Sequence, residues 1–262
     1  MSYYPILSAP NCSGWTTVFN FAPNNWEEEL QIERFINLTW TDGDVWRTEC
    51  LGRLKYEELK TFKFGQVDPI IGESSLPLLS LSEERLPEIS SHLPKIRSTH
   101  SNYPAWRASV GLTGESGASA CFQGEIDPFP SPGSLLTFGS FVQVGCGIDN
   151  YLLFLNIESN PKRRAAEVEI RDAANPTDLK YTVKVESNSL TAISLDWAPM
   201  NEDDLPLIIC RSMSGIPIYF SSYNKGEYLS LEHSHPPAST VIHGQRRSAQ
   251  SLLKKIWFSK VC

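Results

Sequence analysis

Apolar and polar residues alternate along most of the chain, which is the pattern of half-buried β-strands. The alternating runs are rich in β-branched and aromatic residues, and Gly, Pro, Asn and Asp separate them. Ten segments meet these criteria: Arg34 to Trp40, Val45 to Cys50, Leu59 to Phe64, Ala118 to Ile126, Tyr151 to Glu158, Ala165 to Arg171, Lys180 to Glu186, Leu190 to Leu195, Leu207 to Arg211 and Ile216 to Tyr223. The pattern predicts a mainly β protein with two β-sandwich-like halves.

Proline-rich breaks and a change of periodicity divide the chain into parts. The run Asp127-Pro128-Phe129-Pro130-Ser131-Pro132-Gly133 ends one strand and begins a connection, so we place a boundary near residue 140. The predicted parts are residues 1–140, residues 141–243 and a tail at residues 244–262. Within the first part, residues 70–102 are rich in Ser, Pro and Leu, and we interpret them as an inserted connection that packs down as a loop.

Three short matches between the halves indicate an internal duplication. Val18 to Pro23 aligns with Phe154 to Ser159, Leu59 to Phe64 with Leu190 to Leu195, and Ser116 to Phe122 with Ser214 to Phe220. The inserted connection at residues 70–102 would explain why the third match has a different offset. The alternative is chance, because alternation alone produces similarity of this kind.

The C-terminal tail has helical rather than strand periodicity. Apolar residues recur on one arc of a helical wheel, whereas basic residues lie on the opposite arc. The apolar set is Ala249, Leu252, Leu253, Ile256 and Trp257, and the basic set is Arg247, Lys254 and Lys255. We predict a basic amphipathic helix within residues 244–262, which either docks on the protein's own sandwich or makes peripheral contact with an anionic surface.

Composition and charge exclude several classes of function. The net charge of −7 argues against a nucleic-acid-binding protein, because phosphate neutralisation needs clustered Lys and Arg. No window approaches the length of a membrane span, and the N-terminal residues lack the basic region of a secretion signal. The six cysteines show no Cys-x-x-Cys spacing, which favours reduced thiols and a cytoplasmic location.

The histidines near the end of the second half are the first candidate site. His233 and His235 lie two residues apart on an extended segment, and His243 could complete a three-ligand metal site. No known metal motif has this spacing, so a structural or solvent-exposed role is the alternative. We predict no cofactor, and a divalent metal at this segment is the exception that we keep open.

A pair of carboxylates is the second candidate. Glu125 and Asp127 lie two residues apart on a predicted strand, so they share a face and could act as general acid and general base. A solvated strand face is the alternative. The sequence has no phosphate loop, dinucleotide fingerprint, nucleophile elbow or His-Glu-x-x-His motif.

Aromatic and basic residues are the candidates for ligand binding. Trp40 and Trp46 flank a turn, so both could present flat rings for a sugar to stack on, although a core position is the usual one for Trp. Arg107 and Arg211 lie among apolar neighbours and could hold a carboxylate or phosphate bidentately, or form internal ion pairs.

These observations lead to three hypotheses about function. The leading one is a non-catalytic binding or accessory protein that presents a surface between its two halves to a small molecule, a glycan or a protein. The alternative is an enzyme of unfamiliar type, with a site between the halves that uses His233, His235 and His243 together with Glu125 or Asp127. A third is a structural subunit that self-associates through sheet edges, and the sequence leaves the oligomeric state open.

Overall fold

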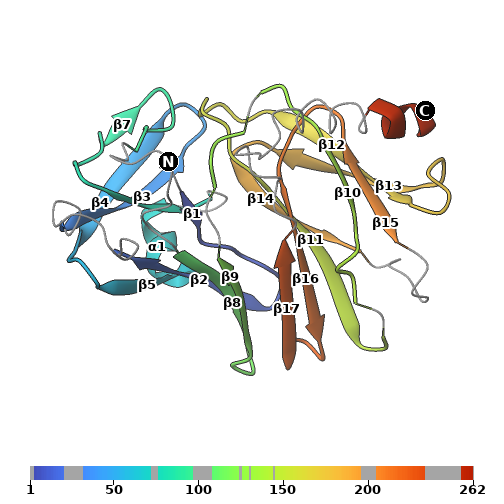
Figure 1. The fold of residues 1–262 in the computed structure, drawn as a ribbon, viewed down its shortest axis with the longest axis horizontal. Helices are drawn as coiled ribbons and strands as arrows, with labels where there is room; N and C mark the ends of the chain where they lie inside the picture. The colour runs from blue at the N-terminus through green and yellow to red at the C-terminus, as the bar shows by residue number, and fades with distance from the viewer. Residues whose placement is uncertain are drawn as a thin grey trace, which may run out of the picture.

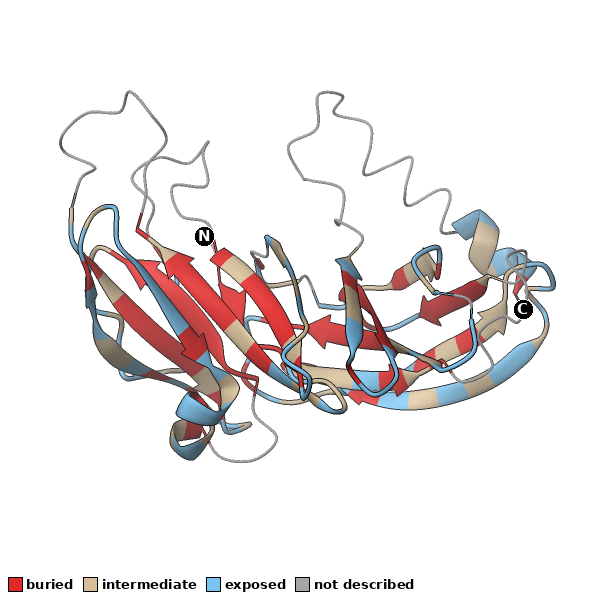
Figure 2. Ribbon diagram, turned by 90° about the horizontal axis from the view of Figure 1, so that it is seen from below, coloured by how far each residue is buried: buried red, intermediate tan, exposed pale blue. Residues whose placement is uncertain are grey.

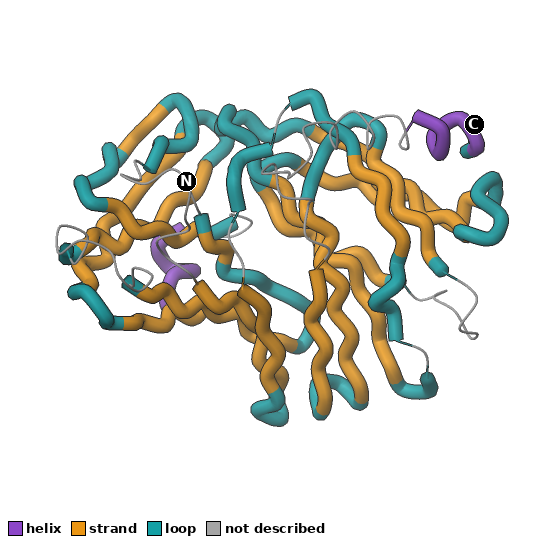
Figure 3. Tube along the Cα trace, in the orientation of Figure 1, coloured by secondary structure: helices purple, strands orange, loops and turns teal. Residues whose placement is uncertain are grey.

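The chain forms two β-sandwiches side by side, with a short helix at the far end of the second one (Figure 1). The computed structural model describes residues 3–20, 32–71, 76–96, 108–123, 126–129, 131–143, 145–195, 205–233 and 255–261. In this described part, strands make up most of the trace and the helices are short (Figure 3). The predicted mainly β fold with two sandwich-like halves is confirmed.

The first sandwich contains two antiparallel sheets. One sheet has the order β1-β6-β3-β4-β7 and the other has the order β5-β2-β8-β9. The strands are β1 (Tyr4–Pro5), β2 (Cys12–Phe19), β3 (Arg34–Thr41), β4 (Trp46–Leu54), β5 (Leu59–Lys63), β6 (Leu78–Ser82), β7 (Ile89–Ser90), β8 (Ala108–Gly114) and β9 (Ser119–Gln123). Helix α1 (Phe64–Ile71) follows β5 and turns Val67 and Ile71 into the core.

The second sandwich also contains two antiparallel sheets, with the orders β10-β15-β12-β13 and β14-β11-β16-β17. Its strands are β10 (Leu135–Phe138), β11 (Ile148–Asn156), β12 (Ala165–Asp172), β13 (Leu179–Glu186), β14 (Ser189–Ser194), β15 (Pro206–Cys210), β16 (Ile216–Tyr223) and β17 (Tyr228–His233). Because β10 pairs with β15, residues 135–138 belong to a sheet of the second sandwich.

The two sandwiches have the same topology once the edge strand β7 is set aside. Strands β1 to β6 occupy the places of β10 to β15, and β8 and β9 occupy those of β16 and β17. The agreement extends to single residues. Val18 pairs with Lys60 in the first sandwich, and their aligned counterparts, Phe154 and Thr191, pair with each other in the second. The turns before β5 and β14 carry positive φ angles at corresponding residues, 62° at Glu57 and 56° at Asn188.

These registers test the three sequence matches. The alignments of β2 with β11 and of β5 with β14 agree with the ladder pairing wherever the structure describes both strands. The alignment of Ser116–Phe122 with Ser214–Phe220 is wrong, because it equates β9 with β16. The sheet order places β8 at the position of β16, and β9 at that of β17.

Residues 70–102 are not an inserted loop throughout. Strand β6 lies between β1 and β3 in the middle of a sheet, with every residue buried, and it is the counterpart of β15. Leu79 and Leu81 join the core from this strand. The prolines of this segment are compatible with a short strand, and the segment without a counterpart begins only after β6.

Each sandwich has its own apolar core between its sheets. In the first, Ile36 and Leu38 from one sheet pack against Val18 and Phe62 from the other. In the second, Val168 and Ile170 meet Phe154 and Ile193 in the same way. Buried positions follow the strands of both sandwiches (Figure 2), as expected when sheets pack face to face.

A third apolar cluster joins the two sandwiches, and we call it the inter-module core. The first sandwich contributes residues from the three strands β4, β6 and β8 and from adjoining loops, and the second contributes the outward face of sheet β14-β11-β16-β17. Its buried members are Tyr3, Leu7, Trp46, Leu76, Leu78, Leu93, Ile96, Val110, Leu112, Ile126, Leu153, Leu155, Ile157, Ile216, Ile218, Phe220 and Leu231. The interface is continuous and apolar, so the halves pack as one body.

The C-terminal helix docks on the protein's own fold in the described part of the tail, residues 255–261. Trp257 makes an edge contact with Phe138 at 5.3 Å between ring centroids, and Val261 is buried against Leu207 and Ile209. The predicted apolar arc is therefore partly wrong, because Ile256 is 44% exposed while Phe258 contacts the sheet. Among the described residues, no helix is both long and apolar enough to cross a membrane.

Candidate functional site

The outward face of sheet β5-β2-β8-β9 is lined by small hydroxyl-bearing residues, and we call it the polar face. The pairing registers place its residues in rows across the four strands. The rows are Thr61-Thr17-Ser109-Gln123, Lys63-Trp15-Gly111-Cys121 and Ser13-Thr113-Ser119. Apart from Thr17 and Gly111, these residues are half-buried or exposed. The face is thus a polar surface that carries one large aromatic ring.

Trp15 lies at the centre of the polar face, and its ring is held in place. An ideal Cβ atom built on Gly111 would lie 2.4 Å from Cζ2 of Trp15, so the indole covers the backbone of β8 at this glycine. The indole Nε1 donates to Oγ1 of Thr113 at 3.1 Å and to Oγ of Ser119 at 3.3 Å. The ring therefore crosses β8 and reaches β9, and a glycine at position 111 makes this possible.

The corresponding face of the second sandwich is apolar and buried around Leu153, Ile218 and Phe220, while Asp149 at its end is exposed. Tyr151 occupies the place of Trp15, and it pairs with Phe220 as Trp15 pairs with Gly111. The rings of Tyr151 and Phe220 stack at 5.9 Å between centroids, in the inter-module core. One of two equivalent faces is thus used for packing between the sandwiches, whereas the other is directed to solvent.

The predicted tryptophan pair does not form a platform. Trp46 is only 1% exposed, and its Nε1 donates to the carbonyl of Ser159 at 2.9 Å. Trp40 packs partly buried against the core of the first sandwich. The sequence reasoning overlooked Trp15, although its alternation with Ser13 and Thr17 was a signal for an aromatic residue on a polar strand face.

Arg211 has partners on the outside of the second sandwich. Its Nε lies 3.1 Å from Oε1 of Glu169, and Nε of Arg171 lies 2.7 Å from the other oxygen of the same carboxylate. The Arg211 guanidinium carbon also lies 5.1 Å from the centre of the Phe258 ring in the C-terminal helix. This arrangement matches the internal ion pair that we kept as an alternative. Arg107 lies outside the described residues.

The charge cluster at Glu169 predicts a specific response to acid. Burial acts to raise the pKa of Glu169, but hydrogen bonds and charge from Arg171 and Arg211 outweigh it, so the pKa lies below its usual value. A lowered carboxyl pKa contributes stability that is complete above the unfolded pKa, about 4.3 for Glu, and is lost as the pH falls through the folded pKa. Glu169→Gln is therefore expected to be less stable than wild type at pH 7, with the difference shrinking below about pH 4. Urea unfolding at several pH values measures this, and a constant difference would contradict it.

The histidine and carboxylate candidates are only partly described. His233 ends β17, and its ring stacks on Phe122 at 4.2 Å between centroids. Asp127 is exposed, just after an isolated bridge between Tyr3 and Ile126. His235, His243 and Glu125 lie outside the described residues. Within the described ranges, no group of three or more His, Cys, Asp or Glu side chains is placed to hold a metal ion, and a metal at this segment stays a prediction.

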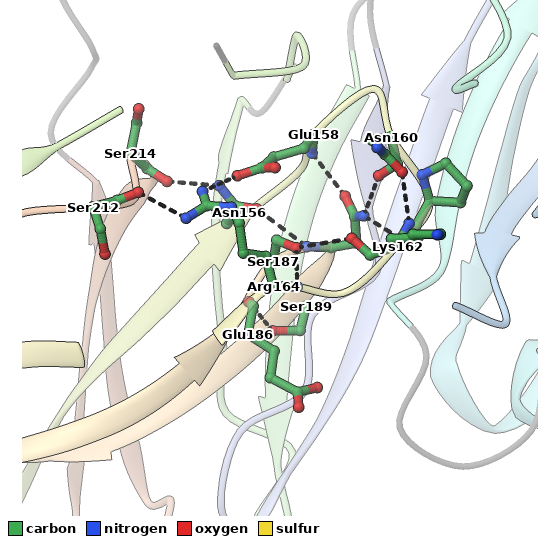
Figure 4. Close-up of polar contacts among 12 residues, drawn as sticks. Asn156, Glu158, Asn160, Lys162, Arg164, Glu186, Ser187, Ser189, Ser212 and Ser214 are labelled. Carbon is green, nitrogen blue, oxygen red and sulfur yellow. Dashed lines mark hydrogen bonds and ion pairs between the residues drawn. The ribbon is translucent and has the colours of Figure 1, made fainter. Parts of the chain in front are cut away.

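A buried polar network holds the loop of residues 157–164, which we call the junction loop (Figure 4). Asn188 uses its whole amide: Oδ1 accepts from the Glu158 backbone N–H at 2.7 Å, and Nδ2 donates to the Asn160 carbonyl at 2.8 Å. Its own backbone N–H donates to Oδ1 of the buried Asn156. Glu158, which is itself buried, pairs with Arg164 at 2.6 Å. These contacts fix the shape of the loop.

The junction loop in turn binds the first sandwich. The Ser159 carbonyl accepts from the Leu93 backbone N–H at 2.8 Å as well as from Trp46, and the Pro161 carbonyl accepts from the Thr41 hydroxyl at 3.2 Å. The loop carbonyls therefore satisfy donors on the other sandwich. The side chains of Asn156, Glu158, Arg164 and Asn188 all bond within the protein, with Nε of Arg164 as the buried atom that has no partner, so the network acts as a joint between the sandwiches.

Comparison with known proteins gives no family for this chain. No protein-family model matches it, and neither the curated proteins nor the solved structures include a significant match.

Proposed function

We propose that this protein is a non-catalytic binding protein that presents the polar face of its first sandwich to a ligand. The observation that carries the proposal is the contrast between the two equivalent sheet faces. The face of the second sandwich, with Tyr151 and Phe220, is apolar and covered. The face of the first, with Trp15 over Gly111, is polar and directed to solvent.

The proposal moves the ligand surface away from the space between the halves. That space contains the inter-module core, and the carbonyls that reach it from the junction loop have donors on the other sandwich. Apart from Thr17 and Gly111, the residues in the rows of the polar face are half-buried or exposed. Its aromatic ring and hydroxyls have the mixture of one flat apolar surface and several polar groups that ligand sites use.

We also propose that the two sandwiches arose by internal duplication and that the protein is cytoplasmic. The shared topology, the matched registers and the equivalent positive φ angles at Glu57 and Asn188 support an origin of the two sandwiches by internal duplication. The five cysteines within the described residues are free thiols, which is compatible with a cytoplasmic location. Under this proposal the second sandwich acts mainly as a support.

A binding panel with charge insertions tests the proposal. We expect the full-length protein to bind one class of immobilised probe among neutral oligosaccharides, acidic polysaccharides, anionic vesicles and proline-rich peptides. The double variant Ser13→Arg/Thr61→Arg crowds the polar face and is expected to lower retention at least tenfold. The control is Thr182→Arg, an exposed strand position on β13, which should bind as wild type does. Lack of binding to every class, binding that survives the double variant, or turnover of the bound probe would each overturn the proposal.

A further inference from the structure

We infer that the ligand of the polar face is an uncharged carbohydrate, one sugar ring of which stacks on Trp15. This inference rests on the proposed function and names the chemistry of its ligand. The first observation is the presentation of the ring. One side of the indole covers the backbone at Gly111, and Trp15 as a whole is intermediate in exposure. A flat, half-exposed indole is a stacking surface for the C–H face of a pyranose.

The second observation is that the ring is already immobilised. Its N–H donates to the hydroxyls of Thr113 and Ser119, which themselves lie 3.1 Å apart, and Ser119 also donates to the Leu112 carbonyl. The rotamer of Trp15 is thus set before any ligand arrives, so binding costs little side-chain entropy.

The third observation is the set of groups around the ring. In the row beside Trp15, the hydroxyls of Thr17 and Thr61 form a hydrogen bond, with 2.7 Å between their Oγ1 atoms. Ser109 and Gln123 continue that row. Hydroxyl and amide groups both donate and accept, which matches the hydroxyls of a sugar. The spacing of neighbouring strands, about 4.8 Å, is comparable with the width of one sugar ring.

The fourth observation is the charge of the polar face. Among the described strand residues that line it, Lys63 is the one charged side chain, in a chain with a net charge of −7. Acidic glycans and phosphate groups are bound by several Lys or Arg side chains acting together. A proline-rich peptide needs a groove lined by several aromatic rings, whereas this face has one ring in the middle of a flat sheet. An uncharged glycan therefore fits best.

Calorimetric titration of the full-length protein tests the inference directly. The probes are cellohexaose, xylohexaose, mannohexaose and laminarihexaose. Heparin is the comparison for an acidic glycan, and a proline decapeptide is the comparison for a peptide that binds aromatic side chains. We expect at least one of the four neutral hexasaccharides to bind, and Trp15→Ala to lower its affinity at least tenfold. Trp15→Phe keeps a smaller ring and is expected to have intermediate affinity. Trp40→Phe is the matched control and should leave affinity unchanged.

A fluorescence measurement keeps the result independent of folding defects. Trp15 becomes covered when a sugar stacks on it, so binding should shift tryptophan emission in wild type and not in Trp15→Phe, while near-ultraviolet circular dichroism confirms that the variant is folded. If none of the four hexasaccharides binds, or if affinity is the same in folded Trp15→Ala, the inference is overturned. Binding of the proline decapeptide or heparin through the polar face would also overturn it, but would leave the proposed binding function in place.

Discussion

Replacing Phe220 by alanine is expected to lower the free energy of unfolding by about 3–5 kcal/mol. The side chain is fully buried in the inter-module core and stacks on Tyr151, so its loss leaves a cavity between two sheets that cannot close independently. Chemical denaturation with circular dichroism detection measures the change. Tyr223→Ala is the control on the same strand, and because Tyr223 is 38% exposed it should cost about 1 kcal/mol or less.

The same variant also reports how the sandwiches are coupled. Because the inter-module core draws residues from both sandwiches, we expect wild type to unfold in one cooperative transition. Phe220→Ala should then shift the midpoint for probes in either sandwich. Two separate unfolding transitions in wild type would contradict the view that the halves pack as one body. So would a Phe220→Ala variant in which only the unfolding of the second sandwich changes.

Replacing Asn188 by glycine is expected to lower the free energy of unfolding by about 2–4 kcal/mol. Glycine tolerates the positive φ of 56°, so the change removes the side-chain hydrogen bonds without adding backbone strain. The Glu158 backbone N–H and the Asn160 carbonyl, both in the buried network, lose their partners. Thermal and urea unfolding measure the loss.

The repeated topology supplies the control for this variant. Glu57 has the corresponding backbone conformation in the first sandwich, but its side chain is exposed. Glu57→Gly relieves the strain of the left-handed backbone, but it also gives the unfolded chain more conformational freedom. Because these two effects offset each other, we expect the free energy of unfolding to change by no more than about 1 kcal/mol. Equal losses in the two variants would show that the backbone turn, and not the amide of Asn188, stabilises the joint.

The strand pattern predicted the fold class and most strands, and two of the strands that it missed, β2 and β8, contain glycines that interrupt the alternation. Strand β8 contains Gly111 and Gly114 and is absent from the ten predicted segments. The structure supplies the reason for one of them, because the Trp15 ring occupies the space above Gly111. Gly111 is needed because of a residue on a neighbouring strand, and the sequence of one strand alone does not show this requirement.

The candidate site could be predicted less well, because it depends on which sheet face the sandwiches use for packing. Trp46 was chosen for its place beside a turn, yet the loop of the second sandwich covers it. Conversely, the alternation of Trp15 with Ser13 and Thr17 indicates a polar strand face, but it does not show whether another sheet covers that face. What separates the two residues is the docking of one sandwich on the other, and this is a long-range property that local spacing does not encode.

The inter-module core also sets an order of events during synthesis. Val110 and Leu112 of β8 belong to it, but their partners Phe220 and Leu231 follow roughly a hundred residues later. At elongation rates of about 5–20 residues per second, the first sandwich has its own strands available about 5–20 s before these partners leave the ribosome. During that interval its apolar flank has no cover from this chain. A nascent chain that stops before β16 would therefore be a substrate for chaperones, although its first sandwich is already complete.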